Sequence, residues 1–480
     1  MAKATNPGPT SSSSSKGSRA PTSFQFVTFS DVDQMRDATA ISSIRRHAMK
    51  DIGRSRRKPK KKWLIEVPID VPIDFNAPVE VVPAPKPAIG GGGVHTFFPI
   101  PIELDQVGKA LLANIWREKG DCLFNAHRED WFSVGLDDPA TFNQILANSE
   151  LHLEATKNPD KLPRETATSV HYHQLAVSNI RKRMALGEVS THILGCITGL
   201  LVYTEIAGAY ERWLPQRNGL LSIIESLEGG LDGIEVNPQL RAATSWVELR
   251  GSFRQDIVPA VPLPQKWVQV ADHLRTTTYY DYCPFAQGGI RDDMRCPLVS
   301  TFKELTQLGA LVDGHLRENR ADEARGTDII IWTNVLAHRL LTLRPLQSAC
   351  ERLDKTSLLL LESWRLAMLT VIGRIYEMYG AHPLNASTYV RKQHELLSKN
   401  QIDWDGFMRT KLWIVYLAAL EAGENTAKRR WFVMELVTSA ADEGNHDYDE
   451  LMERIKGVLW IPQLFEDKTE PLQRDIERTS

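Results

Sequence analysis

The stretch YHQLAVSNIRKRMA at residues 172–185 indicates an amphipathic helix and decides the fold class. The basic residues Arg181, Lys182 and Arg183 are expected on its outer face. Gly187 is expected to end the helix, because glycine readily adopts the left-handed conformation found after many helices. The inner face is predicted to carry the apolar residues Leu175, Val177, Ile180 and Met184.

Two further helical segments follow closely, at residues 191–210 and 217–227, and Trp213 and Pro215 are expected to separate them. Short connections favour antiparallel neighbours, so the sequence predicts three consecutive antiparallel helices. Later helices are predicted at residues 328–343, 357–379, 389–397, 403–422, 427–439 and 448–459.

Alternating runs of apolar and polar residues, which would indicate strands, are few. The sequence therefore predicts an all-α, multi-helix domain over residues 94–466, followed by a charged tail at 467–480. No fixed repeat period is present, so a regular solenoid is not expected.

Composition excludes several classes of protein. With 42% hydrophobic content in 480 residues, the chain can bury a large core. Its five cysteines are odd in number and irregularly spaced, which argues against a disulfide framework and favours a reducing compartment. No signal peptide is evident, and the longest apolar run is shorter than the roughly 18 residues of a membrane helix.

The N-terminal part has a different composition from the rest. Residues 1–40 are rich in Ser and Pro, with five consecutive Ser, and are predicted to be disordered. Residues 63–93 contain many prolines and end in Gly90 to Gly93, which predicts a linker that is first stiff and then flexible. Those glycines are not followed by Lys and Ser or Thr, so a phosphate-binding loop is not indicated.

Between these two segments lies a strongly basic one, at residues 41–62. It contains ten Lys and Arg and one acid, a charge of +9, and the rest of the chain therefore carries −12 of the total −3. RRKPKKK at residues 56–62 is typical of a nuclear localisation signal. The whole segment could also contact a nucleic-acid backbone without sequence specificity. The candidate residues for nuclear import or DNA contact are Arg45, Arg46, Lys50, Arg54, Arg56, Arg57, Lys58, Lys60, Lys61 and Lys62.

Catalytic and metal-binding patterns are incomplete. His394 and Glu395 begin like a zinc-protease helix, but Ser398 stands where the second histidine would be needed. His171 and His173 alternate along a helix and would point to different faces, with His192 further away.

Other candidate groups are equally weak. Cys283 and Cys296 belong to no CxxC pair. Asp292 and Asp293 lie between arginines in a predicted loop, where local neutralisation is favoured over a metal site. We therefore predict no catalytic residue, no metal site and no cofactor.

Several blocks together resemble the fungal-specific transcription factor family, in the branch whose helical regulatory domain usually follows a binuclear zinc cluster. The central blocks are residues 172–183, 197–205 and 213–230, the last beginning with Trp213. Later blocks are ESWRLAML at 362–369, LWIVYLAALEA at 412–422 and IKGVLWIP at 455–462. FFPIPIEL at 97–104 and DPATFNQILANSELHL at 138–153 resemble the opening of that domain.

The resemblance implies a nuclear transcriptional regulator with a helical regulatory domain, and not an enzyme. The family's DNA reader needs six cysteines in two close triplets, and no Cys precedes Cys122 in this sequence. We therefore expect the chain to act through transcriptional regulators or zinc-cluster relatives, as a homodimer or heterodimer, with non-specific DNA contact and no membrane. The expected setting is control of a metabolic or secondary-metabolite gene set.

Two other classes of function stay open at this stage. One is a helical small-molecule enzyme with a basic tail, for which only Asp292, Asp293, His171 and His173 offer polar groups. The other is a scaffold or dimerisation module for zinc-cluster regulators.

Overall fold

The described part of the chain folds into α-helices connected by loops. The computed structural model describes residues 100–117, 127–157, 163–277, 297–318, 322–344, 355–380, 386–444 and 447–479. Within these ranges it has seventeen α-helices and no β-strand, which confirms the all-α prediction. The predicted disordered tail, basic segment and linker lie outside the described residues.

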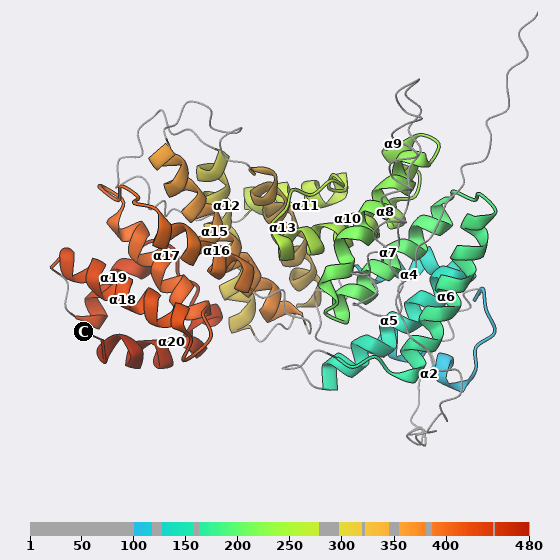
Figure 1. Cartoon of the computed structure of the whole chain (residues 1–480), viewed down its shortest axis with the longest axis horizontal. Helices are drawn as coiled ribbons and strands as arrows, with labels where there is room; N and C mark the ends of the chain where they lie inside the picture. The colour runs from blue at the N-terminus through green and yellow to red at the C-terminus, as the bar shows by residue number, and fades with distance from the viewer. Residues whose placement is uncertain are drawn as a thin grey trace, which may run out of the picture.

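The first helices form one packed group, which we call the N-terminal helix group (Figure 1). Its largest interfaces are between α5 and α6 and between α5 and α7. The members of the group are α2 (Gln106–Arg117), α4 (Arg128–Leu136), α5 (Pro139–Lys157), α6 (Ala167–Ala185), α7 (Thr191–Ile206), α8 (Tyr210–Ser226), α9 (Gly230–Glu235) and α10 (Pro238–Gln255).

The remaining helices form the C-terminal helix group, in which α11 and α13 lie nearest to the N-terminal helix group (Figure 1). α13 packs against α10 on one side and against α12 and α15 on the other. The helices are α11 (Gln265–Thr277), α12 (Pro297–Arg317), α13 (Glu323–Thr342), α15 (Lys355–Tyr379), α16 (Ser387–Lys399), α17 (Met408–Glu421), α18 (Ala427–Asp442), α19 (Tyr448–Lys456) and α20 (Pro462–Glu477).

One hydrophobic core runs through both groups, from Ala140 to Ile476. Trp364 and Trp413 are fully buried in it, and Trp431 is partly buried against the same core. A smaller cluster under α2, α4 and α5 completes the N-terminal group. Among the described residues, no helix has both the length and the apolar character that a membrane crossing would require.

Local sequence explains why α6 begins and ends where it does. The Thr166 hydroxyl accepts a hydrogen bond from the Ser169 amide, and the Ser169 hydroxyl accepts one from the Thr166 amide, each 3.0 Å long. This capping box satisfies two amides at the start of the helix. Gly187 follows the helix with φ of 84°, as predicted, and its amide donates to the Met184 carbonyl.

Two expectations about the faces of α6 are wrong. Leu175 is 44% exposed, because the buried stripe instead runs through Tyr172, Ala176, Ile180 and Met184. Arg183 is not an unpaired outer charge but is partly buried between two carboxylates. Its guanidinium lies 2.5 Å from Asp138 and 2.7 Å from Glu188. The pair with Asp138 fastens the end of α6 to the start of α5, and the pair with Glu188 fastens it to the connection that leads into α7.

The predicted position of the break between the second and third helices is also wrong. The break lies between Ile206 and Tyr210, and α8 includes both Trp213 and Pro215. Pro215 lies in the second turn, where a proline removes one backbone hydrogen bond. Trp213 is 1% exposed, and a Cβ atom at Gly251 would lie 1.8 Å from its ring. Close packing of Trp213 on α10 therefore fixes this part of α8.

The chain end differs from the prediction as well. Most of the predicted charged tail at 467–480 belongs to α20, in which Leu472 and Ile476 are buried. Two α20 residues form ion pairs with earlier helices: Asp467 with Arg374 at 2.6 Å and Lys468 with Glu421 at 3.0 Å. The many charges of this segment thus lie on one face of an amphipathic helix.

Candidate functional site

The residues predicted from sequence to contact DNA or to direct nuclear import are not placed by the structure. All lie outside the described residues: Arg45, Arg46, Lys50, Arg54, Arg56, Arg57, Lys58, Lys60, Lys61 and Lys62. Cys283, Cys296, Asp292 and Asp293 also lie outside them.

The candidate histidines on and near α6 lie in different environments. His171 and His192 are exposed, whereas His173 stacks on Tyr203 with ring centroids 4.3 Å apart. The His173 Nδ1 lies 3.0 Å from the Gln144 Oε1. Burial, followed by the nearby Arg212 charge, lowers the His173 pKa to about 4. Within the described ranges, no group of three His, Cys, Asp or Glu residues could hold a metal ion.

His394 and Glu395 also point to different surroundings. The His394 ring packs edge-on against Trp431, with centroids 4.9 Å apart. Glu395 instead forms an exposed ion pair with Arg391 at 2.9 Å.

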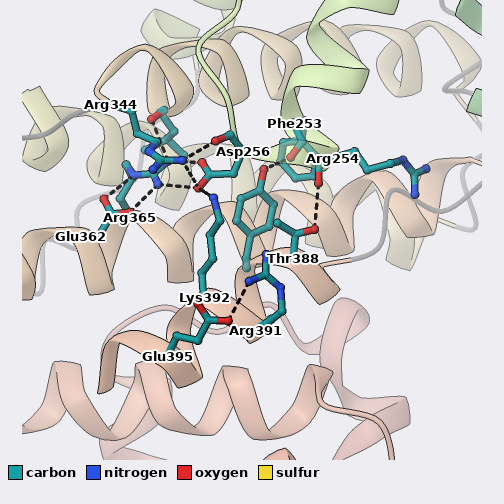
Figure 2. Close-up of polar contacts among 12 residues, drawn as sticks. Phe253, Arg254, Asp256, Arg344, Glu362, Arg365, Thr388, Arg391, Lys392 and Glu395 are labelled. Atoms are coloured by element: carbon teal, nitrogen blue, oxygen red, sulfur yellow. Dashed lines mark hydrogen bonds and ion pairs between the residues drawn. The ribbon is translucent and has the colours of Figure 1, made fainter. Parts of the chain in front are cut away.

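A charge cluster around a buried carboxylate lies where the two helix groups meet, and sequence reasoning did not predict it. We call it the Asp256 cluster; it consists of Asp256, Arg344, Glu362, Arg365 and Lys392 (Figure 2). Asp256 follows α10 and is fully buried. Arg344 lies just after α13, Glu362 and Arg365 lie on α15, and Lys392 lies on α16. The cluster thus draws four segments together.

Three cations contact the single Asp256 carboxylate. Arg365 donates to both of its oxygens, at 2.9 and 3.2 Å. Arg344 donates at 2.9 Å and Lys392 at 2.5 Å to Oδ2. Arg365 also pairs with Glu362 at 2.7 Å, and its side chain is 0% exposed. Because charge-assisted bonds of this kind satisfy buried groups, Asp256 and Arg365 can keep their charges away from water, while Arg344, Glu362 and Lys392 stay partly exposed.

The electrostatics of the cluster follow from this geometry. Burial opposes ionisation of Asp256, but the Arg365 charge and the hydrogen bonds from Arg365 and Lys392 outweigh it, so the Asp256 pKa lies below 3.8. Burial lowers the pKa of Lys392, although the Asp256 carboxylate opposes that effect. Asp256 therefore stays ionised at neutral pH.

The backbone at Asp256 has an uncommon conformation. Its φ is 52°, in the left-handed region that Asp tolerates better than most residues. This turn ends α10. The hydroxyls of two α16 residues then donate to α10 carbonyls: Thr388 to Arg254, at 2.9 Å, and Tyr389 to Phe253. The start of α16 thereby satisfies the Arg254 carbonyl and adds a second donor to the Phe253 carbonyl, which also accepts from the Asp256 amide (Figure 2).

A second buried contact, which we call the His127 contact, joins α4 to α13 and α15. The Asn334 side-chain amide lies 3.2 Å from the His127 Nε2, and the Asn334 Oδ1 accepts a hydrogen bond of 2.7 Å from the Tyr376 hydroxyl. The His127 ring lies 4.7 Å from the ring of Trp267. All three polar side chains of the contact are at most 1% exposed.

His127 is held in its neutral form. Burial is the largest influence and lowers its pKa below 6.5, while Asp130, 3.8 Å away, opposes this shift. Arg250 and Lys266 lower the pKa further. With Nε2 accepting from Asn334, the ring proton lies on Nδ1, facing Asp130.

An apolar cavity lies between α4, α5, α7 and α10, bordered by Trp131, Gly195, Gly199 and Trp246. Its volume of about 30 Å³ has room for two water molecules or so, since one needs roughly 10–15 Å³. Small-molecule sites are typically about 300–1,000 Å³. This cavity is therefore a packing gap rather than a metabolite site.

Two comparisons with known proteins gave no relative: no curated protein and no solved structure matches the chain. A family model does match it. The model is described as the fungal specific transcription factor domain, and it covers residues 110–458, from within α2 to just past α19.

Proposed function

Because the chain belongs to the fungal specific transcription factor domain family, we propose that it regulates a metabolic or secondary-metabolite gene set through protein partners. The match over residues 110–458 carries this proposal, since it includes nearly all of the described helices. Family membership supports a fungal transcription regulator in general, and favours a regulator over an enzyme.

The partners proposed for the chain are transcriptional regulators, above all zinc-cluster relatives. The reason is the cysteine pattern: the five cysteines are Cys122, Cys196, Cys283, Cys296 and Cys350, without the two close triplets that bind two zinc ions. Sequence-specific DNA recognition would then come from the partner, in a heterodimer, while the basic segment adds contacts to the DNA backbone.

The same basic segment supports a nuclear location. Neutralising residues 56–62, by replacing Arg56, Arg57, Lys58, Lys60, Lys61 and Lys62 with Gln, is expected to move the tagged protein out of the nucleus. Replacing Arg45, Arg46 and Lys50 with Gln is the matched control, and import is expected to persist. Unchanged nuclear accumulation of the first variant would remove the localisation proposal.

A tethering assay tests the regulatory function itself. The full chain would be fused to an unrelated DNA-binding domain and brought to a reporter promoter in a fungal host. We expect a several-fold change in reporter expression, in either direction, relative to the DNA-binding domain alone. A reporter that does not respond, with the fusion shown to occupy its sites, would overturn the proposal.

A further inference from the structure

A surface hollow of about 580 Å³ lies beside α16, between the start of α15, the loop after α16, and α17 and α18. Its volume falls within the range of small-molecule sites, about 300–1,000 Å³. The polar side chains that matter for its chemistry are Asn400, Gln401 and Asp403 from the loop, and Lys411 and Glu435 from the helices; Trp404 adds an indole ring.

The loop that forms one wall has a defined conformation. The Asn400 side-chain Nδ2 donates to the Leu396 carbonyl at 2.9 Å. The Asp403 Oδ1 accepts from the Asp405 backbone amide at 3.0 Å. Gly406 then adopts a φ of 74°, which lets the chain turn into α17. These bonds commit one polar atom each of Asn400 and Asp403 and leave Asn400 Oδ1 and Asp403 Oδ2 as acceptors.

The charges around the hollow do not cancel. Lys411 and Glu435 neutralise each other across 2.8 Å, and the Lys411 side chain is only 15% exposed. Asp403 has no ion-pair partner among the described residues, and it is exposed. The lining therefore has one uncompensated negative charge.

The hydrogen-bonding groups of the lining also favour a positively charged ligand. Among the described residues, the one cation of the lining is engaged by Glu435, while Asn400 Oδ1 and Asp403 Oδ2 accept no hydrogen bond. An indole face attracts cations as well, by roughly 0.5–2 kcal/mol. A ligand that fits this lining donates hydrogen bonds and carries positive charge.

We propose that the hollow is a binding site for a small organic ammonium ion. Its ammonium group donates to the Asp403 Oδ2 and the Asn400 Oδ1, and its alkyl part lies against Trp404 and its apolar neighbours in the lining. This proposal goes beyond the proposed function, and its test uses the purified full-length chain without DNA or partners.

Calorimetric titration tests the site with two probes of equal chain length: putrescine, which is charged at neutral pH, and 1,4-butanediol, which is not. The decisive variant is Asp403→Asn, which keeps the oxygen that holds the loop and removes the charge. Asp405→Asn is the matched control, because Asp405 is exposed in the same loop and does not line the hollow.

We expect the wild-type chain to bind one putrescine saturably and to bind no 1,4-butanediol. Asp403→Asn should weaken putrescine binding at least tenfold, and Asp405→Asn should leave it unchanged. Any of three results would overturn the proposal: no putrescine binding, an equal loss in both variants, or equal binding of the two probes. The second would show only diffuse attraction to an acidic surface.

Discussion

The Asp256 cluster and the His127 contact both join the N-terminal helix group to α13 and α15, but one is ionic and the other is neutral. In the first, three cations surround a carboxylate whose pKa is lowered. In the second, an imidazole with a lowered pKa accepts a hydrogen bond from an amide. The two contacts should therefore respond differently to loss of a partner and to pH.

The difference follows from how burial acts on each group. Burial penalises a charge, so a buried carboxylate persists only where cations compensate it, and a buried imidazole without sufficient compensation stays neutral. Removing one charged partner should thus cost more than removing one neutral partner. Acid should act first on the neutral contact, because protonation would create a buried charge there.

The largest expected effect comes from Asp256→Asn, which keeps the side-chain shape and removes the charge. Arg365 would then keep only Glu362 as an ion-pair partner, while Arg344 and Lys392 would lose the carboxylate that they share. Breaking a buried pair in this way typically costs about 3–5 kcal/mol. Urea unfolding of the full chain measures the loss. Glu395→Gln, which breaks an exposed pair on the neighbouring turn of α16, serves as control and should give no detectable change.

Tyr376→Phe tests the neutral contact and should have a smaller effect. It removes the hydroxyl that donates to the Asn334 Oδ1 and leaves that buried oxygen without this donor. The expected loss of unfolding free energy is about 1–3 kcal/mol. Tyr448→Phe is the control, because the Tyr448 hydroxyl meets Tyr416 in a partly exposed position. An effect of Tyr376→Phe equal to that of Asp256→Asn would contradict the comparison.

Thr388→Val probes the helix-end contact beside the ionic cluster. Valine keeps the shape of the side chain but cannot donate to the Arg254 carbonyl. That carbonyl is partly buried, so the expected loss is about 0.5–1.5 kcal/mol, in the same urea experiment. A loss above that of Tyr376→Phe would show that this junction matters more than the geometry indicates.

The smallest expected effect is the fall in the free energy of unfolding as the pH drops below neutral. The His127 pKa is lowered from 6.5 in the folded chain, so its contribution to stability is full above pH 6.5 and is lost as pH falls below that value. His173 and His338, each with a pKa of about 4, act in the same direction between pH 6.5 and pH 4. Asp256 contributes nothing there, because its carboxyl stays ionised down to below pH 3.8.

Unfolding measured at pH 7.5 and pH 5.5 checks this assignment. The wild-type chain should be less stable at pH 5.5. His127→Gln should reduce the difference between the two pH values, while Asp256→Asn should leave it unchanged. An undiminished difference in His127→Gln would remove His127 as a source of the acid sensitivity.

Much of the fold could be predicted from sequence, because apolar periodicity within single helices is a local signal. The helix predicted at 357–379 is observed as α15 at Lys355–Tyr379, and the one predicted at 448–459 as α19 at Tyr448–Lys456. Errors arose where tertiary packing overrode a local rule. Pro215 does not break α8, and Asp403 and Trp404 belong to a loop rather than to the helix predicted at 403–422.

The Asp256 cluster could not be predicted in the same way. Asp256 lies 109 residues from Arg365 and 136 from Lys392 in the sequence, and periodicity says nothing about such pairs. One signal was present: Glu362 and Arg365 interrupt the apolar run of α15 three residues apart, as expected of charges paired inside a core. That Arg365 also pairs with Asp256, from the other helix group, could be identified only from the fold.

Chromatin immunoprecipitation of the tagged full-length protein, in the fungus that encodes it, tests the central claim most directly. We predict discrete promoter peaks that share a sequence motif, and their loss when the zinc-cluster partner that reads this motif is deleted. A flat profile across the genome, with the protein expressed and folded, would contradict the account.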